Sequence, residues 1–195
     1  APQWSRSDNA QRLDFAHQVV ETHRCTSVLD LGCGEGKLLE KLLRTTSIDR
    51  ILGMDVSTRA LEIATKRLRL ERMHDRQRQR IDLIHGSVLY RDARLRGFDA
   101  AVLIEVLEHL EEERLDSLER SLFGDAAPRL VLITTPNSEY NELFETLPAG
   151  KFRHRDHRFE WTREQFEHWC QPIATQYGYE VTYHPHGPVN ASSGA

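Results

Sequence analysis

Short apolar segments alternate with longer amphipathic segments along most of the sequence, and this alternation constrains the fold more than any other feature. The apolar segments have the length of buried strands, while the segments between them repeat their hydrophobic residues with helical periodicity. Strands that alternate with helices in this way form a mostly parallel sheet with helices on both faces, which is an α/β fold. We expect strands over residues 27–31, 50–56, 80–86, 98–106, 129–137 and 179–185, and helices over residues 8–23, 36–45, 57–73, 111–123 and 162–178.

The alternation is interrupted by a long polar and aromatic segment over about residues 137–161. A connection of this length inside a compact domain usually has a function of its own. The chain has 195 residues, a length that suits one domain. We therefore expect a single domain over residues 1–195 that carries one functional insertion.

Composition excludes several classes of protein. The net charge of −4 argues against a globally basic nucleic-acid-binding protein. No apolar stretch is long enough for a membrane span or a signal peptide. The three cysteines are scattered and include no CxxC pair, which indicates neither a disulfide framework nor a structural zinc site. We expect a cytoplasmic protein, and the lack of an initiating methionine suggests a domain excised from a longer chain.

A glycine-rich turn, VLDLGCGEG at residues 28–36, joins the first expected strand to its helix. Gly32 and Gly34 allow a tight turn and a close approach of a ligand to the backbone. Asp30 lies at the strand end, where its charge disfavours a pyrophosphate and favours a ligand with an ammonium group. Asp55 ends the second strand, the position from which a carboxylate binds ribose hydroxyls in nucleotide-binding sheets. The turn therefore indicates a site for a nucleoside that carries an ammonium group.

These features resemble the class I S-adenosylmethionine-dependent methyltransferases, whose fold is Rossmann-like. The resemblance implies S-adenosylmethionine as the cofactor, with its methionine part beside Asp30 and its ribose beside Asp55. The adenine would then approach Ser87 and Val88, which follow the third strand. The alternative is a tight turn between two solvated aspartates. The cofactor-binding residues that the resemblance implies are Asp30, Gly32, Gly34, Asp55, Ser57, Ser87 and Val88.

The segment IEVLEHL, residues 104–110, places two carboxylates and an imidazole where the fourth expected strand ends. Ligands of open α/β sheets bind outside the carboxyl ends of the strands, which puts Glu105 next to the expected cofactor. If the backbone turns helical here, Glu105, Glu108 and His109 share one helix face. Such a set suits Mg²⁺, Mn²⁺, Fe²⁺ or Co²⁺. The alternative is an ordinary acidic helix start, which the helix dipole favours.

The insertion offers further ligands and a second type of contact. His154 and His157 lie in FRHRDHRFEWTREQF, residues 152–166, and either could complete a metal site. Basic and aromatic side chains are interleaved here in a way that suits a single-stranded nucleic-acid end, through phosphate contacts and base stacking. The alternatives are solvated loop histidines and aromatic residues that anchor the loop to the core. The interleaved residues are Arg153, Arg155 and Arg158 with Phe152, Phe159 and Trp161.

Together, EVLEHL and FRHRDHRFEWTREQF resemble the Hen family, the RNA 3′-terminal ribose 2′-O-methyltransferases of plants, animals and bacteria. The resemblance extends from about Arg12 to Pro188 and is highly specific at these two motifs. His157 is preferred over His154 because it precedes RFEWTR, the block that matches best. The family usually adds a final antiparallel strand after GPVN, where the sequence stops, so we expect an incomplete sheet edge. The residues that the resemblance assigns to catalysis are Arg12 and the metal ligands Glu105, Glu108, His109 and His157.

The resemblance implies transfer of a methyl group from S-adenosylmethionine to the 2′-hydroxyl of the 3′-terminal ribose of RNA, with the help of Mn²⁺ or Mg²⁺. It implies an RNA end with free 2′- and 3′-hydroxyls as substrate. It further implies a bacterial RNA-repair system, in which a polynucleotide kinase-phosphatase is the partner through regions outside this chain. Two alternatives stay open, namely a methyltransferase that acts on a small molecule and a non-catalytic domain that binds RNA ends.

Overall fold

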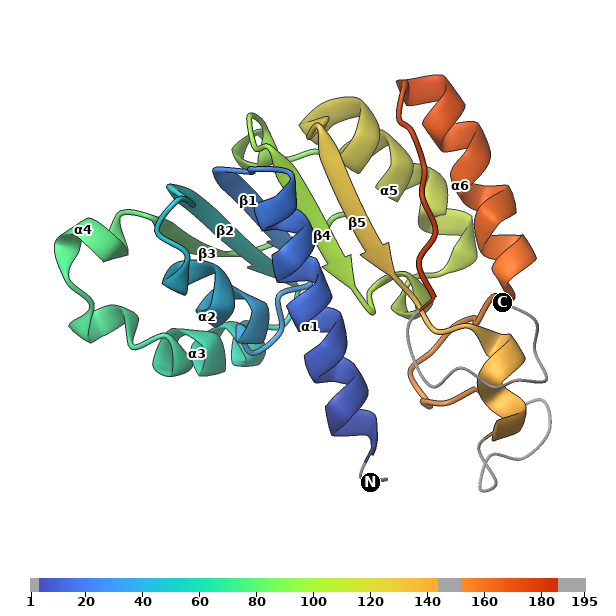
Figure 1. The fold of residues 1–195 in the computed structure, drawn as a ribbon, viewed down its shortest axis with the longest axis horizontal. Helices are drawn as coiled ribbons and strands as arrows, with labels where there is room; N and C mark the ends of the chain where they lie inside the picture. The colour runs from blue at the N-terminus through green and yellow to red at the C-terminus, as the bar shows by residue number, and fades with distance from the viewer. Residues whose placement is uncertain (1–3, 144–151, 186–195) are drawn as a thin grey trace.

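The computed structural model describes residues 4–143 and 152–185, and its centre is a five-stranded, wholly parallel sheet (Figure 1). The strand order is β3-β2-β1-β4-β5, so the chain builds outward from β1 in one direction and then returns to the other side of β1. The carboxyl ends of all five strands meet at one edge, and the order switches between β1 and β4. The strands are β1 (Ser27–Leu31), β2 (Arg50–Asp55), β3 (Ile81–His85), β4 (Ala100–Ile104) and β5 (Leu130–Thr134).

Helices connect the strands in sequence. The α-helices are α1 (Trp4–Thr22), α2 (Lys37–Arg44), α3 (Thr58–Arg67), α4 (Asp75–Arg78), α5 (Leu115–Glu119) and α6 (Arg163–Tyr177). The helix α5 continues as the π-helical segment η5 (Arg120–Ala126). Short 3₁₀ helices occupy several connections, namely η1 (Leu70–Arg72), η2 (Ala93–Leu95), η3 (Leu107–His109), η4 (Glu112–Arg114) and η6 (Ser138–Leu143).

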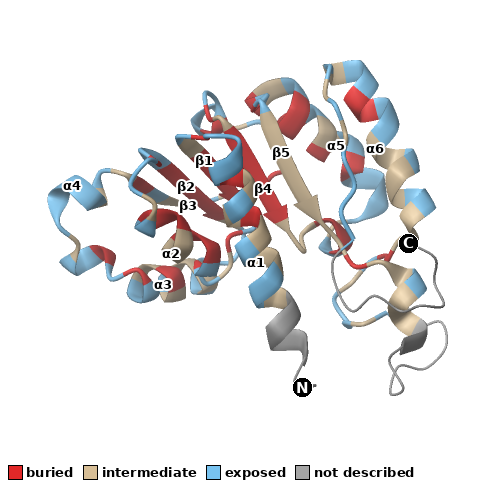
Figure 2. Ribbon diagram, viewed as in Figure 1, coloured by how far each residue is buried: buried red, intermediate tan, exposed pale blue. Residues whose placement is uncertain are grey.

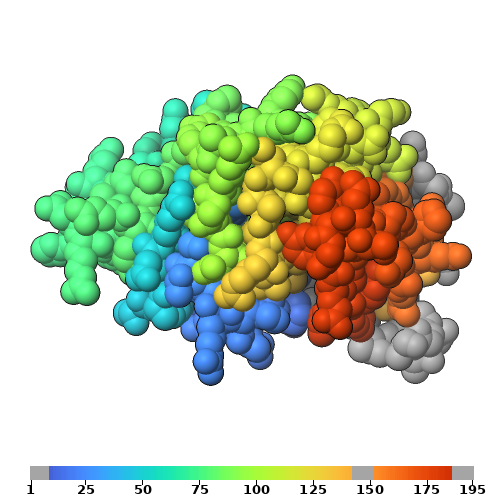
Figure 3. Space-filling model, turned by 90° about the horizontal axis from the view of Figure 1, so that it is seen from above, coloured from blue at the N-terminus to red at the C-terminus, as the bar shows by residue number. Residues whose placement is uncertain are grey.

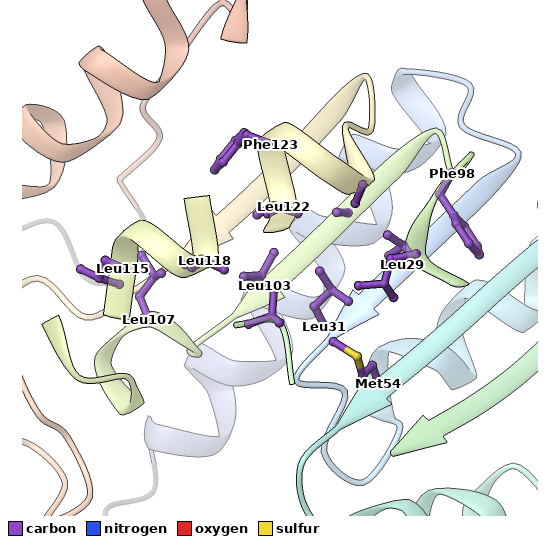
Figure 4. Packing of buried hydrophobic residues seen from close by; sticks show 14 of the residues in the cluster. Leu29, Leu31, Met54, Phe98, Leu103, Leu107, Leu115, Leu118, Leu122 and Phe123 are labelled. Atoms are coloured by element: carbon purple, nitrogen blue, oxygen red, sulfur yellow. The ribbon is translucent and has the colours of Figure 1, made fainter. Parts of the chain in front are cut away.

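The two faces of the sheet carry separate hydrophobic clusters, as the alternation of side chains along β4 requires. Val102 packs in the cluster with Val20 of α1 and Leu42 of α2. Its neighbour Leu103 packs in the cluster on the other face, with Leu118 of α5. Figure 4 shows the leucines of β4 and of the following helices converging, and Figure 2 shows the central strands buried between the helices. The expected α/β fold with a parallel sheet covered on both faces is confirmed.

Three predicted helices differ from the structure by several residues. The helix predicted over residues 111–123 is divided into η4, α5 and the π-helical segment η5. The first helix begins at Trp4, well before the predicted residue 8. The helix predicted over residues 57–73 ends at Arg67, and Arg69 takes a left-handed conformation with φ of +53°. A residue with this backbone conformation cannot continue a right-handed helix, so the chain restarts as η1.

The strand predicted over residues 179–185 is absent. This segment runs beside α6 and β5, where Figure 3 shows the C-terminal region against the region coloured yellow. Its aromatic side chains explain the path, because Tyr183 stacks edge-on against Phe166 of α6 at 6.3 Å and the Tyr179 hydroxyl donates to the carbonyl of Pro128. The GPVN segment, residues 187–190, near which we expect the sheet edge to be incomplete, lies outside the described residues.

The insertion over about residues 137–161 begins and ends at one point. Asn137 and Trp161 form an isolated parallel bridge, and the Ser138 N–H donates to the Trp161 carbonyl at 2.9 Å. This bridge places both ends of the insertion at the carboxyl edge of the sheet, after β5. Within the part of the chain that the structure describes, no helix has the length and apolar character needed to span a bilayer.

Candidate cofactor site and metal centre

The glycine-rich turn lies at the carboxyl end of β1 and is tied to β2. The N–H groups of Gly32 and Cys33 both donate to the Met54 carbonyl, at 2.8 and 3.0 Å. A Cβ atom at Gly32, where φ is +83°, would lie 2.6 Å from Val106 Cγ2. A Cβ atom at Gly34 would meet nothing within 4 Å, and φ there is +51°. Gly32 is therefore required for packing, whereas Gly34 leaves open space above the turn that suits a ligand.

Asp55 organises the turn through two backbone groups. Its Oδ2 accepts a hydrogen bond from the Gly34 N–H, and its Oδ1 accepts one from the Ser57 N–H, both at 2.8 Å. The Ser57 hydroxyl caps α3 by accepting from the Ala60 N–H at 3.2 Å. Because a carboxylate has about four acceptor positions, Asp55 keeps capacity for the hydroxyls of a ribose. Asp55 thus ties Gly34 and Ser57 together at the carboxyl ends of β1 and β2.

Asp30 is buried beneath the turn with only 3% of its surface exposed. Its Oδ2 atom has no hydrogen-bond partner among the described residues. Burial, and then the charge of Asp55, raise the pKa of Asp30 to about 7. An unpaired buried carboxylate of this kind is stabilised by a cationic ligand, so the site fits the ammonium group of S-adenosylmethionine.

The two residues predicted to face the adenine lie after β3. The Ser87 hydroxyl accepts from the Leu89 N–H at 3.3 Å and shapes the local turn. Val88 is buried in the cluster that includes Leu29 and Leu31 of β1. Both residues therefore belong to the same end of the sheet as the glycine-rich turn.

The chain leaves β4 through Glu105 in a left-handed conformation, with φ of +54°. The next residue, Val106, has φ of −117°, and the 3₁₀ helix η3 begins only at Leu107. The predicted continuous helix face that starts at Glu105 is therefore wrong. Instead, the Glu105 N–H donates to the carbonyl of Thr134 at 3.1 Å, and the Thr134 hydroxyl donates to Glu105 Oε1 at 3.2 Å.

Three potential metal ligands come together at this edge. Glu108, His109 and His157 each offer one ligand atom, and these atoms all lie within 4.8 Å of one another. Glu105 falls outside this group, and its Oε2 lies 3.7 Å from a guanidinium nitrogen of Arg12. The structure thus joins three of the four predicted ligands across two distant segments, and it places Arg12 beside the fourth.

His154 does not join this group of ligand atoms. Its ring centroid lies 6.3 Å from that of His109, whereas the ring of His157 lies 5.0 Å from His109. The His154 side chain is 58% exposed and its Nδ1 faces Asp156 at 3.5 Å. Of the two histidines that the sequence leaves open, only His157 is grouped with Glu108 and His109.

Glu108 is fully buried and only partly satisfied. Its Oε2 accepts from the Thr135 hydroxyl at 3.3 Å, and its Oε1 has no partner among the described residues. Burial, and then the charge of Glu105, raise the pKa of Glu108 to about 8. A cation bound here would relieve both effects, so the residues present fit a divalent metal.

The His109 side chain suits the role of a metal ligand. Burial lowers the pKa of His109, which keeps its imidazole neutral near pH 7, the form that binds a metal. Its Nδ1 lies 3.3 Å from the carbonyl oxygen of Asp156. Since a carbonyl can only accept, Nδ1 carries the proton and Nε2 is left as the free ligand atom.

The insertion is held against η3 by backbone contacts as well. The Arg158 N–H donates to the Glu108 carbonyl at 2.6 Å, close to the contact between His109 and Asp156. These contacts fix the loop that carries His157 against the segment that carries Glu108 and His109.

The basic and aromatic residues of the insertion divide into two sets. Phe159 is buried and lies 4.5 Å from the Trp161 ring, so it anchors the loop to the core. The Arg153 guanidinium donates to Asn141 Oδ1 at 2.6 Å and to the Asn137 carbonyl. The exposed members are Phe152, Arg155, with 90% of its side chain accessible, and Arg158, which pairs with Glu111 at 3.1 Å. Only this second set is exposed to solvent.

Sequence patterns did not identify several residues that support the site. Thr134 and Thr135 hold the two carboxylates from the end of β5, and Glu160 holds His157. The sequence pattern at the two threonines indicates only the end of a strand, so it does not predict a role in the site. Glu160 follows His157 by three positions within the block RFEW, whose sequence pattern indicates roles only for Arg158, Phe159 and Trp161.

Comparison with known proteins identifies the family. Residues 29–122 match a family model described as a methyltransferase domain. The crystal structure of the methyltransferase domain of a bacterial Hen1 protein, CtHen1-CN, is 44% identical, with a TM-score of 0.86 over 96% of this chain and 95% of that one. The chain belongs to the Hen1 family of methyltransferase domains. The predicted family and the class I methyltransferase fold are both confirmed.

Larger relatives contain this Hen1 domain as one part. The structure of small RNA methyltransferase HEN1 is 32% identical, with a TM-score of 0.87 over 95% of this chain and 24% of that protein. The small RNA 2′-O-methyltransferase of Mus musculus is 37% identical over 187 residues, which are 94% of this chain and 47% of the mouse protein. The chain therefore spans about half the length of this curated relative or less.

Proposed function

We propose that this domain transfers a methyl group from S-adenosylmethionine to the 2′-hydroxyl of the 3′-terminal ribose of RNA, with the help of a divalent metal. The observation that carries the proposal is the group of Glu108, His109 and His157 at the switch edge of a Hen1 methyltransferase sheet. This group lies one strand away from the glycine-rich turn and Asp30, since β4 pairs with β1. An acceptor oxygen and a methyl donor can thus be brought together.

The residues of this chain divide the work in the proposed reaction. Asp30, Asp55 and the glycine-rich turn bind the cofactor and orient it. Glu108, His109 and His157 would hold the metal, with Glu105 as the fourth ligand and Arg12 beside it to balance the carboxylate charge. A divalent metal in such a site supplies Lewis-acid activation of a hydroxyl and a template for two neighbouring oxygens.

Selectivity for an RNA 3′ end follows from a requirement for two neighbouring hydroxyls. A deoxyribose lacks the 2′-hydroxyl, and a 3′-phosphate blocks the other oxygen. Arg155 and the exposed Phe152 lie on the same loop as His157, where they are available to a phosphate and a base of the terminal nucleotides.

The test is a methylation assay with matched RNAs that end in 3′-hydroxyl, 3′-phosphate or 2′-deoxyribose, with and without EDTA. We expect transfer only to the unblocked ribose end, and only when metal is present. Equal transfer to the deoxy-ended RNA, or full activity in EDTA, would contradict the proposal. A single turnover with labelled cofactor separates this enzyme from an RNA-end-binding domain without chemistry, and competition by RNA ends separates it from a small-molecule methyltransferase.

Three further expectations stay predictions. They are the choice between Mn²⁺ and Mg²⁺, the kinase-phosphatase repair partner and the cytoplasmic location.

A further inference from the structure

Glu160 is a buried carboxylate of the insertion that the site described above does not use as a ligand. Its side chain has 0% of its surface exposed. A carboxylate in such surroundings is destabilising unless hydrogen bonds satisfy it. The bonds that it makes therefore indicate what it is there to hold.

Glu160 accepts hydrogen bonds from three separate points of the insertion. Its Oε2 accepts from the Asn141 side-chain amide at 2.7 Å, and its Oε1 accepts from the Arg153 N–H at 2.6 Å. The third partner is His157, whose Nδ1 lies 2.6 Å from Oε1. Both oxygens of the carboxyl group therefore act as hydrogen-bond acceptors.

This arrangement determines which nitrogen of His157 is free. Because Oε1 accepts, His157 donates through Nδ1, and Nε2 is the ring nitrogen left to bind a metal. The His157 side chain is itself only 9% exposed, which limits the rotation of its ring. Histidines that bind metals commonly donate their second ring N–H to a carboxylate in this way, and the contact fixes the ring orientation.

We propose that Glu160 is a positioning residue, which orients His157 so that its Nε2 faces Glu108 and His109. This inference rests on the proposed metal site and deepens it. Asn141 and the Arg153 N–H hold the carboxylate in turn, and the Arg153 guanidinium bonds to Asn141 Oδ1 at 2.6 Å. The fold of the insertion is thereby coupled to the geometry of one ligand.

The test measures Mn²⁺ affinity by calorimetry and by electron paramagnetic resonance on Glu160→Gln. The glutamine keeps the shape but lacks the charge, and its amide group can accept through only one of its two ends. We expect Mn²⁺ to bind about 10- to 100-fold more weakly, with the affinity for S-adenosylmethionine unchanged within twofold. The matched control is Glu111→Gln, which removes an exposed carboxylate that pairs with Arg158 of the same loop and should leave Mn²⁺ affinity unchanged.

A double-mutant cycle separates positioning from a general structural role. In a His157→Ala background, Glu160→Gln should cause no further loss of residual Mn²⁺ affinity beyond about twofold. Glu160→Asp, which keeps the charge but is shorter, should give an intermediate loss. Wild-type Mn²⁺ affinity in Glu160→Gln, or a parallel loss of S-adenosylmethionine affinity in both Glu160 variants, would overturn the inference.

Measurement of the His157 tautomer in the metal-free protein separates a failure of this inference from a failure of the proposed function. Long-range ¹H–¹⁵N spectra should show the proton on Nδ1 in the wild type and a mixture of tautomers in Glu160→Gln. If the wild type shows this tautomer but binds no Mn²⁺, the metal site of the proposed function fails. If the wild type binds Mn²⁺ and His157 carries its proton on Nε2, the role of Glu160 is wrong and the metal site stands.

Discussion

Asp30 and Glu108 are two buried carboxylates at the same edge of the sheet, and each has an oxygen without a hydrogen-bond partner. Each also has a pKa raised first by burial and then by a neighbouring carboxylate, to about 7 for Asp30 and about 8 for Glu108. They differ in what surrounds the free oxygen. Asp30 lies beneath a glycine-rich turn with open space above it, whereas Glu108 faces two imidazoles.

We infer from this comparison that one type of buried acid serves two kinds of cation in the proposed reaction. Imidazole nitrogens beside Glu108 complete a ligand set for a metal ion. The glycine-rich turn beside Asp30 offers backbone groups and room, which suit an organic cation carried by a nucleoside. If this assignment is right, substitution of either acid should affect one ligand and spare the other.

The largest effect is expected from Glu108→Ala. Removal of the central metal ligand should lower methyl transfer about a thousandfold or more, since metal activation contributes several kcal/mol to the transition state. The measurement is turnover on RNA with a free 3′ end, together with the dissociation constant for S-adenosylmethionine. The latter should change by less than about twofold. Comparable losses of both would mean that the two sites are not separate.

Asp30→Asn should have the opposite effect on the two ligands, because it should weaken cofactor binding and leave metal binding unchanged. It removes the charge that pairs with the ammonium group of the cofactor, a hydrogen bond of the charged type that is worth about 1.5–3 kcal/mol. We therefore expect S-adenosylmethionine to bind about 10- to 100-fold more weakly, with Mn²⁺ affinity unchanged. Calorimetric titration of each ligand checks both values. Unchanged cofactor affinity would leave Asp30 as a buried acid of the fold alone.

The same substitution should change how stability depends on pH. The folded-state pKa of Asp30 is about 7 and its unfolded value is about 3.9, so the folded state binds an extra proton between them. Its contribution to stability is present below about pH 4 and is lost as the pH rises through about 7. In the cofactor-free protein, Asp30→Asn should therefore raise the melting temperature more at pH 8 than at pH 5, by about 5 °C.

A scan of melting temperature against pH for both proteins makes this measurement. An equal shift at the two pH values would show that Asp30 is ionised throughout and would contradict the raised pKa.

The smallest effect is expected from His154→Ala. His154 is largely exposed and lies outside the group formed by Glu108, His109 and His157. Its loss should change turnover and Mn²⁺ affinity by less than about threefold, since an exposed side chain of this kind contributes little. The matched substitution is His157→Ala, which should abolish metal-dependent transfer. If His154→Ala abolished transfer and His157→Ala did not, the metal ligand from the insertion would be His154 and not His157.

The residues of the candidate cofactor site could be grouped from the sequence because they are local. Asp30, the glycines and Asp55 lie within one strand–helix–strand unit, whose geometry the glycine pattern largely determines. The metal group could be predicted only through a family resemblance. Its ligands come from η3 and from the insertion, and hydrogen bonds between these segments bring them together.

The predictions that failed depended on tertiary contacts. The helix face at Glu105 was wrong because the backbone there is left-handed, which no propensity of glutamate indicates. The strand over residues 179–185 was wrong because Tyr183 packs on α6. Phe159 is an anchor of the loop rather than a surface for bases, and its neighbour Glu160 supports His157.

The left-handed backbone of Glu105 implies a conflict between stability and activity at this position. A residue other than glycine costs about 1–2 kcal/mol in this conformation, and the Glu105 charge also opposes ionisation of Glu108. Glycine would remove both costs, but it would also remove the carboxylate and its contacts with Thr134 and Arg12. Under the proposed function, the Glu105 carboxylate is therefore kept despite its cost in stability, and a substitution that relaxes the backbone here would be expected to lower activity.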